Sequence, residues 1–390
     1  MTGNFLDYVK LGLRQHTGYA QYFFPFFILK QKLVGETAKA AYAQTCEVFK
    51  IQQSSIIIQE CTQDFDLAIA EYLTQSVPQL VMRLQFPPLV FVLFENAIQS
   101  QSALLLLVNH EAFDGRSAYY FTRVFFEVYL HGHTDLVAQY MSDEAFVKAT
   151  SAVFGLRGWS QLFAEIGSLL FEKIRGVAHC ALIDLAAVAY RQLHRSQYAS
   201  VRLSRANIHR REIGTMNAFL ITVIAQELLT MKAQIRIAIP IAFKKRPIDL
   251  VGNHVTSFSV TLTNQENILF RIVSLLKKYS LDTKALASYM LFTLLKRKGG
   301  PTAVYQFFSD WSRCTTAYIS NYGYFSEAHE LIAGTGGFNS PVQAALGMVF
   351  TITYHAESVY IGLACSDQIM NKEHMSVMLH NIKNTLERAS

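Results

Sequence analysis

The feature that most constrains the fold of this chain is a short aliphatic segment, Ala103 to Val108, which is bounded by polar residues. A run of this length and composition predicts a strand that is buried on both faces of a sheet. After the loop NHEAFDG, Gly115 permits a sharp change of direction. The segment from Ser117 to Leu130 then has helical periodicity, and Ser117 is its expected N-cap. The sequence therefore predicts a strand, a short loop and a helix in succession.

His110 gives this loop a side chain that titrates near neutral pH. An imidazole held at the end of a strand can take a proton from a hydroxyl or amine nucleophile and return it to a leaving group. Asp114 is compatible with two arrangements: its carboxylate orients His110, or it turns away and pairs with a distant cation that locks the loop. Standing alone, the His-x-x-x-Asp pattern fits a hydrogen-bonded histidine at the edge of a core better than a catalytic one.

The loop resembles the HHxxxDG signature of the acyltransferase superfamily that contains chloramphenicol acetyltransferase, nonribosomal peptide condensation domains and polyketide-associated or alcohol acyltransferases. His110, Asp114 and Gly115 match the second histidine, the aspartate and the glycine, whereas Asn109 stands where the first histidine is expected. The resemblance implies that His110 is the general base and that Asp114 is mainly structural. It also implies that the residue at position 109 supports the geometry of the loop.

Further segments resemble the family in the same order along the chain, from about Phe24 to the end. They are a helix that opens the second half, a strand, a glycine-asparagine turn, a second strand, a serine-asparagine-x-glycine segment, an antiparallel pair and a terminal helix. In this sequence they are Thr215–Leu220, Ile239–Lys244, Leu250–Asn253, Val255–Leu262, Ile319–Gly323, Met348–Tyr354 with Val359–Ala364, and Lys372–Arg388.

The resemblance implies an α/β fold of two chloramphenicol acetyltransferase-like mixed-sheet domains with a cleft between them. Residues 1–175 would form the N-terminal subdomain that carries the HxxxDG motif, and residues 176–390 the subdomain that completes the cleft. A chain of 390 residues with a hydrophobic fraction of 51% suits two cores. The apolar helix expected over Ser160 to Ile174 fits a buried position better than a lipid-facing one.

The same resemblance suggests partners for His110 in the second subdomain. Ser320 and Asn321, with Tyr354 behind them, are the candidates for stabilising an oxyanion, although Ser320 and Asn321 are equally compatible with turn positions. The family usually places an arginine after the strand that begins near Ile239, as the partner of the motif aspartate. Here three basic residues compete for that role: Lys244, Lys245 and Arg246.

The formal net charge of +6 includes two basic clusters that could attract an anionic donor. The candidates for binding donor phosphates or an acidic carrier protein are Arg210, Arg211, Lys244, Lys245 and Arg246. A solvated face without a partner is equally compatible with these clusters. Nucleic acid is not an expected partner, because the basic residues are not interleaved with a recognisable reading helix or single-strand platform.

Several other site classes are not expected. His131-Gly132-His133 fits a surface turn after a helix rather than a metal site, so no metal is predicted. The glycine-rich segment Gly334 to Gly337 lacks the lysine of a phosphate loop and is expected to be a flexible connection. There is no GxSxG elbow to supply a serine nucleophile.

Cysteine usage and the N-terminal segment point to the cytoplasm. The 5 cysteines are odd in number and form no CxxC pair, so neither a disulfide framework nor a zinc cluster is indicated. Met1 to Arg14 does not resemble a secretory signal, and the aromatic segment Tyr19 to Leu29 is too short to cross a bilayer. We expect that segment to form a loop and a strand, with no stable membrane insertion.

The resulting functional hypothesis is acyl transfer from acyl-coenzyme A or an acyl carrier protein to an alcohol or amine, with no bound cofactor. Two alternatives stay open. One is amide or ester formation between two carrier-bound substrates. The other is a catalytically silent module that only docks carrier proteins, which Asn109 in place of the first histidine would suggest.

Overall fold

The structure is a computed structural model, and its described part comprises most of the predicted strands and helices. The continuous described ranges are 22–77, 88–96, 98–110, 112–141, 196–208, 215–242, 249–252, 255–265, 267–279, 315–325, 330–339 and 348–388, with isolated positions between 145 and 167 and at 300. The predicted helix over Ser160 to Ile174 and the predicted domain boundary at residue 175 lie largely or wholly outside this part. Both stay predictions.

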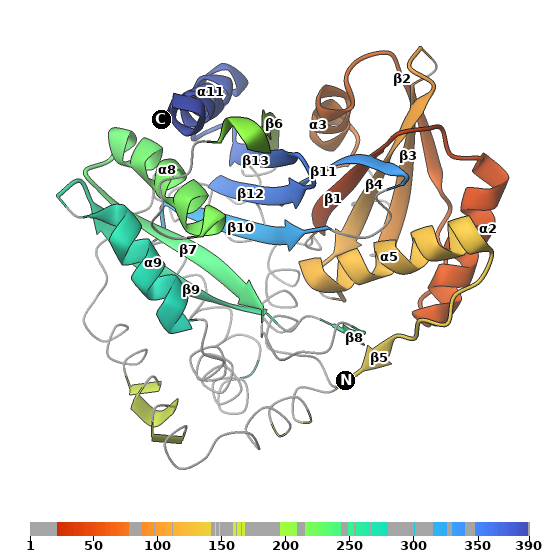
Figure 1. Ribbon diagram of the computed structural model, residues 1–390, viewed down its shortest axis with the longest axis horizontal. Coiled ribbons are helices and arrows are strands. Elements are labelled where there is room, and N and C mark those ends of the chain that lie inside the picture. Colours follow the sequence, from red (N-terminus) through yellow and green to blue (C-terminus); the bar gives the residue numbers. More distant parts are fainter. Residues whose placement is uncertain are drawn as a thin grey trace.

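The first lobe is a five-stranded sheet with the strand order β11-β1-β4-β3-β2. Only β2 and β3 run parallel; the other neighbouring strands are antiparallel. Helices α2 and α5 cover one face of this sheet and α3 lies on the other (Figure 1). The elements are β1 Tyr22–Leu29, α2 Gly35–Val48, β2 Ile57–Cys61, α3 Phe65–Gln75, β3 Leu89–Asn96, β4 Gln101–Asn109, α5 Gly115–His131 and β11 Ile332–Asn339.

The second lobe is a six-stranded mixed sheet with the order β6-β13-β12-β10-β7-β9. Helices α8, α9 and α11 pack on one of its faces (Figure 1). The elements are β6 Ser196–Ser204, the 3-10 turn Arg205–Asn207, α8 Met216–Met231, β7 Gln234–Ala242, β9 Val255–Thr263, α9 Ile268–Tyr279, β10 Ala317–Tyr324, β12 Met348–His355, β13 Ser358–Ser366 and α11 Lys372–Arg388. A two-stranded parallel pair, β5 (Gln139–Tyr140) and β8 (Leu250–Val251), links the lobes.

The predicted strand, loop and helix around His110 are confirmed, with one correction. β4 is almost entirely buried, and helix α5 follows it. The helix begins earlier than predicted: Asp114, not Ser117, is the N-cap, and its carboxylate accepts a hydrogen bond from the Ser117 N–H. Ser117 therefore lies within the first turn. Aspartate and serine are both common N-caps, so sequence preference alone does not separate the two positions.

Other local predictions from the sequence are also confirmed. Thr215 caps α8 by accepting a hydrogen bond from the Ala218 N–H. β12 and β13 form the antiparallel pair, and α11 is the terminal helix. Helix α5 ends at a left-handed Gly132 with φ 76°, so the predicted turn at residues 131–133 is correct. No helix within the described ranges is long and apolar enough to cross a membrane.

The prediction that Gly334 to Gly337 forms a flexible connection is wrong. These residues lie in β11, which pairs with β1 along its length and so joins the first lobe although it belongs to the second half of the chain. Glycine is needed here because of crowding: a Cβ on Gly336 would overlap the ring of Phe26. A Cβ on Gly362 of β13 would likewise meet the Gly337 carbonyl. β11 is thus wedged between the two sheets.

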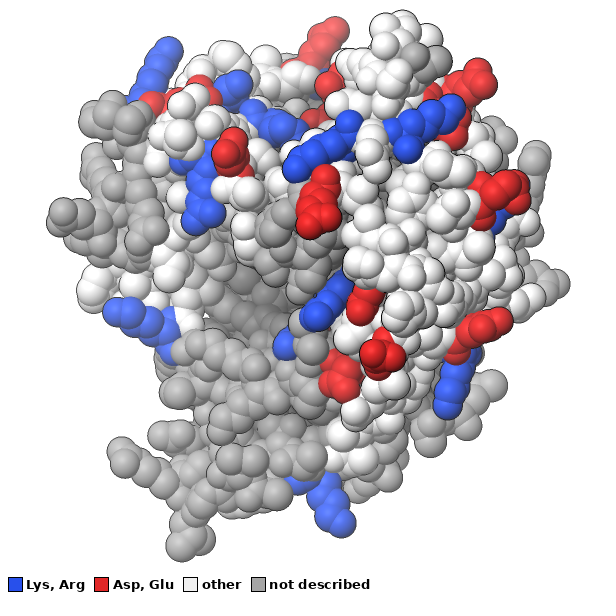
Figure 2. All heavy atoms as spheres, turned by 45° about the vertical axis from the view of Figure 1, so that its right-hand side comes forward, with Lys and Arg blue, Asp and Glu red and all other residues white. Residues whose placement is uncertain are grey.

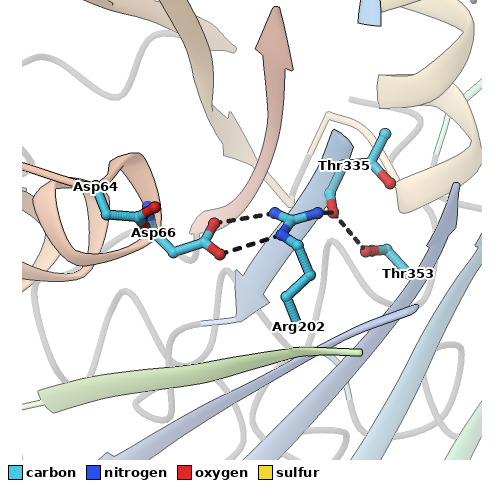
Figure 3. A network of polar contacts seen from close by, with 5 residues as sticks. All are labelled: Asp64, Asp66, Arg202, Thr335 and Thr353. Atoms are coloured by element: carbon cyan, nitrogen blue, oxygen red, sulfur yellow. Dashed lines mark hydrogen bonds and ion pairs between the residues drawn. The ribbon is translucent and has the colours of Figure 1, made fainter. Parts of the chain in front are cut away.

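Behind β11, the lobes meet through aromatic rings and one ion pair. The ring of Phe26 lies 5.2 Å from that of Tyr360 and 6.2 Å from that of Phe338, measured between centroids. Arg202 of β6 donates two hydrogen bonds to the carboxylate of Asp66 in α3, at 3.0 and 3.3 Å (Figure 3). Its guanidinium also donates to the Thr335 carbonyl of β11 and lies over the ring of Tyr360.

Candidate functional site

His110 is the first residue after β4, and its imidazole is partly exposed. The ring packs against Phe23 of the neighbouring strand β1, with ring centroids 4.9 Å apart and planes inclined by 57°. Because Phe23 belongs to the core beneath α2 and α5, His110 lies on the α5 side of the first sheet. The histidine is therefore carried by a buried strand and supported on one side by an aromatic ring.

Backbone and side-chain hydrogen bonds determine the shape of the loop after His110. The Asn109 carbonyl accepts from the N–H groups of Ala112 and Phe113, each at 3.1 Å. One carboxylate oxygen of Asp114 accepts the Ser117 N–H at 2.8 Å, at the positive end of α5, where a negative charge is stabilised. Asp114 is only 1% exposed. The aspartate of the motif thus acts as a buried helix cap, whatever further partner it has.

The second half of the chain contributes directly to this loop through Gly252. The Gly252 carbonyl accepts hydrogen bonds from the Asp114 N–H at 3.2 Å and from the Ser117 hydroxyl at 2.8 Å. The Gly252 N–H donates back to the Ser117 oxygen at 3.1 Å. Gly252 has φ 144°, a conformation that favours glycine. The glycine of the predicted glycine-asparagine turn therefore fastens the loop, while Asn253 lies outside the described residues.

Tyr322 of β10 is a site residue that the sequence analysis missed. A Cβ on Gly115 would lie 3.2 Å from Cδ1 of Tyr322, so the ring sits directly against the start of α5. The same ring meets Phe23 edge-on, with centroids 5.8 Å apart. Gly115 in the motif signals a close approach, but nothing in the sequence identifies the residue that approaches it. Tyr322 thus brings β10 to the His110 loop.

The three predicted oxyanion candidates are divided between the two faces of the second sheet. Asn321 and Tyr354 lie on the helix side: the Asn321 amide donates to Asn217 of α8 at 2.7 Å and to the Tyr354 hydroxyl at 3.1 Å. Ser320 is buried and lies beside Thr351, whose hydroxyl accepts from Asn339 of β11 at 3.3 Å. Ser320 therefore shares the face of Tyr322, towards the first lobe.

Burial raises the pKa of both tyrosines in this region. For Tyr354, desolvation outweighs the opposing hydrogen bond from Asn321. For Tyr322, desolvation raises the pKa well above its usual range, with a further contribution from the nearby Tyr119. Both hydroxyls are consequently neutral at physiological pH and can donate or accept hydrogen bonds without acting as bases.

The predicted basic residues lie outside the described part of the chain: Arg210, Arg211, Lys244, Lys245 and Arg246. On the face seen in Figure 2, the described Lys and Arg side chains are interspersed with Asp and Glu. Among the described residues, no group of three or more His, Cys, Asp or Glu side chains comes together in a way that could hold a metal ion.

Comparison with solved structures identifies proteins that share this architecture. A mutant of the starter condensation domain of rhizomide synthetase RzmA, in complex with C8-CoA and Leu-SNAC, superposes with a TM-score of 0.66 at 11% identity, covering 97% of this chain and 91% of that chain. The fold is that of a condensation domain. It is thus a two-lobed, chloramphenicol acetyltransferase-like mixed α/β fold, as the resemblance implied.

Two further structures agree with this assignment of the fold. The condensation domain from Monacolin K polyketide synthase MokA gives a TM-score of 0.62 at 12% identity, covering 94% of this chain and 91% of that chain. An epimerization domain of tyrocidine synthetase B gives 0.61 at 12% identity, covering 98% and 92%. No protein-family model matches the sequence, and a search of curated proteins finds no match. At such low identities the likeness establishes the fold alone.

In this condensation-type fold, the described residues bring the loop of His110, Asp114 and Gly115 into contact with Gly252, which follows β8, and with Tyr322 of the second lobe. The arrangement fixes an imidazole at a strand end, next to an interface between two lobes. A group placed this way is suited to proton transfer, because its support comes from rigid elements.

Proposed function

We propose that this protein transfers an acyl group from a thioester donor to a hydroxyl or amine acceptor, with His110 as general base. The observation that carries the proposal is the position of His110: it follows a buried strand, and its loop is fastened by the Asp114 cap and by Gly252 from the second half of the chain. Solved structures with this fold include condensation domains, one of them crystallised with C8-CoA.

In the proposed reaction, His110 takes the proton of the acceptor as its oxygen or nitrogen attacks the thioester carbonyl. A new carbon–oxygen or carbon–nitrogen bond forms and gives a tetrahedral oxyanion. Its collapse breaks the carbon–sulfur bond, and the imidazolium returns the proton to the departing sulfur. We propose Ser320, rather than Asn321 or Tyr354, as the side chain that faces the oxyanion. Both N–H groups of the Asn321 amide already point to Asn217 and Tyr354.

The donor in this proposal is acyl-coenzyme A or an acylated carrier protein, acting as co-substrate rather than as a resident cofactor. Both carry a phosphopantetheine arm and negative charge, which the basic residues Arg210, Arg211 and Lys244 to Arg246 would attract. The nearest enzymatic alternative is condensation between two carrier-bound substrates. A requirement for a carrier-bound acceptor would favour it over simple acyl transfer.

A catalytically silent docking module is the second candidate function. The observation in its favour is Asn109, which is buried where the motif of the family has its first histidine. This candidate predicts binding of acylated carrier protein without consumption of the thioester. The experiment below separates it from the enzymatic proposal.

The test is thiol release and product mass with a panel of acyl-coenzyme A and acyl-carrier thioesters plus mixed alcohols and amines. We expect His110→Ala to lower the transfer rate by about 10²- to 10⁴-fold. His133→Ala is the matched control, because His133 lies in the exposed turn after α5, and its rate should equal that of the wild type. Equal background rates for wild type and His110→Ala, together with retained binding of acylated carrier, would replace the enzymatic proposal with the docking module.

A further inference from the structure

The ring of Tyr322 lies between the His110 loop and the crossover strand β11. On one side it contacts Gly115, the first residue of α5. On the other side it contacts Gly337, where an added Cβ would lie 2.8 Å from Cε2 of the ring. At both positions, the absence of a side chain on glycine leaves space for the Tyr322 ring. The ring therefore sets the spacing between α5 and β11.

Two hydrogen bonds in series fix the far end of this ring. The Tyr322 hydroxyl donates to the side-chain oxygen of Asn339 at 2.7 Å, and the Asn339 amide donates to the Thr351 hydroxyl at 3.3 Å. Tyr322 is also the extra residue at an irregularity of β10, since Asn321 and Gly323 face consecutive residues of β12. Gly323 follows with φ 84°. The backbone is thus shaped locally to direct this side chain towards the first lobe.

A chain of aromatic contacts connects Tyr322 to the imidazole. Phe23 is the shared neighbour, with its ring centroid 5.8 Å from that of Tyr322 and 4.9 Å from that of His110. Phe23 is only 1% exposed, so it cannot move without displacing its neighbours. A change at position 322 would therefore reach His110 by two routes, through Phe23 and through the start of α5.

We propose that Tyr322 is a positioning residue that holds the His110 loop of the first lobe in register with the second lobe. The expected effect of Tyr322 on catalysis rests on the proposed function, whereas its expected effect on the position of the His110 imidazole does not. Because the hydroxyl is neutral and bonded to Asn339, Tyr322 acts by geometry rather than by proton transfer. Displacing a catalytic group by about 1 Å can cost about 10²-fold in rate.

The first test replaces the ring. Tyr322→Leu removes the contact with Gly115 and Phe23, so we expect kcat to fall by roughly 10- to 10²-fold with a much smaller change in KM. Tyr322→Phe keeps the ring and loses the hydroxyl, and should recover most of kcat. Tyr72→Leu is the matched control: Tyr72 is a buried tyrosine of α3, which lies on the opposite face of the first sheet from the loop, and its ring packs on Phe94. It should lower stability without the loss of kcat.

The second test is independent of activity. In protein labelled at the histidine Cε1 position, the His110 signal is assigned by its disappearance in His110→Ala. We expect Tyr322→Leu to shift this signal and its titration midpoint, because the ring current and packing of Phe23 change, whereas Tyr72→Leu leaves both in place. A wild-type His110 signal and wild-type kcat in Tyr322→Leu would overturn the inference. Full transfer activity in His110→Ala would instead contradict the proposed function and leave the NMR result to decide the positioning role.

Discussion

Within the described residues, two regions in which the two halves of the chain meet are built in different ways. The loop seam consists of Asp114, Gly115 and Ser117 against Gly252 and Tyr322, held by short hydrogen bonds to backbone atoms and by one ring. The aromatic seam lies behind β11 and consists of close-packed rings with one ion pair. Its members are Phe24, Phe26, Tyr198, Phe338 and Tyr360, with Asp66 and Arg202.

We expect the aromatic seam to contribute mainly to the stability of the protein, and the loop seam to the position of His110. The aromatic seam buries several large rings, each of which removes a large apolar surface from water, so it should dominate the cohesion of the lobes. The loop seam consists mainly of hydrogen bonds to backbone atoms, which fix the orientation of a few atoms around His110. Substitutions in the aromatic seam should therefore change the free energy of unfolding, and those in the loop seam should change the rate of the reaction more than the stability.

The largest expected effect is on stability, from Gly336→Ala in β11. The added Cβ would overlap the ring of Phe26, which is fully buried and cannot rotate away. We expect a loss of about 3 kcal/mol in the free energy of unfolding, measured by urea titration. Gly35→Ala, at the start of α2 with open space around it, is the control and should be neutral or slightly stabilising. An unchanged free energy of unfolding in Gly336→Ala would show that there is room for a Cβ between β11 and the ring of Phe26.

The ion pair of the aromatic seam predicts a stability change that depends on pH. Burial raises the pKa of the Asp66 carboxyl above its usual range, and the neighbouring guanidinium of Arg202 opposes that rise. Since the pKa of Asp66 is higher in the folded than in the unfolded state, proton binding by this carboxyl stabilises the native state. This stabilisation is lost as the pH rises through the folded-state pKa. Removing Arg202 raises the folded pKa further and leaves the ionised carboxylate with less compensation.

We therefore expect Arg202→Ala to cost about 2 kcal/mol at pH 7 and less as the pH falls, because protonated Asp66 no longer depends on the guanidinium. The side chains are 28% and 18% exposed, so the cost is set below that of a fully buried pair. Urea titrations at several pH values measure this dependence. Lys32→Ala breaks the more exposed pair of Lys32 with Glu95 and should cost about 0.5 kcal/mol or less. A destabilisation by Arg202→Ala that stays constant with pH would contradict the role given to Asp66.

The two seams also differ in how far the sequence predicts them. The loop seam is partly local: the aliphatic strand, the following glycine and the N-cap all lie within a few residues of His110, so β4 and α5 were predictable. The partners of the loop, Gly252 and Tyr322, are distant in sequence. An aromatic residue in a strand is typical of any core, and so Tyr322 carried no signal of its own.

Unlike β4 and α5, β11 is an element for which the local sequence predicts the wrong structure. Its glycines favour a loop when only local preference is considered, because glycine weakens an isolated strand. They occupy a strand here because the side chains of Phe26, Tyr322 and Arg202 leave no room for a Cβ at Gly336, Gly337 and Gly334, respectively. That crowding arises because β11 pairs with β1, which lies near the other end of the sequence. No local pattern contains this information, so the aromatic seam had to be seen in the structure.

Among the substitutions in the two seams, Ser117→Ala in the loop seam has the smallest expected effect on stability, and it is the sharpest test of the comparison. It removes the hydroxyl that bonds both the carbonyl and the N–H of Gly252. The expected cost is about 1 kcal/mol in the free energy of unfolding, since the Gly252 N–H loses its acceptor. Ser102→Ala is a matched control, because Ser102 is also buried and its oxygen accepts the Leu33 N–H, away from the loop. If loop geometry governs the reaction, the two variants will lose similar stability while only Ser117→Ala loses kcat, by roughly tenfold or more. Equal kcat values in a transfer assay would mean that the loop keeps its shape without the hydrogen bonds between Ser117 and Gly252. The proposed link between the loop seam and the reaction rate would then be wrong.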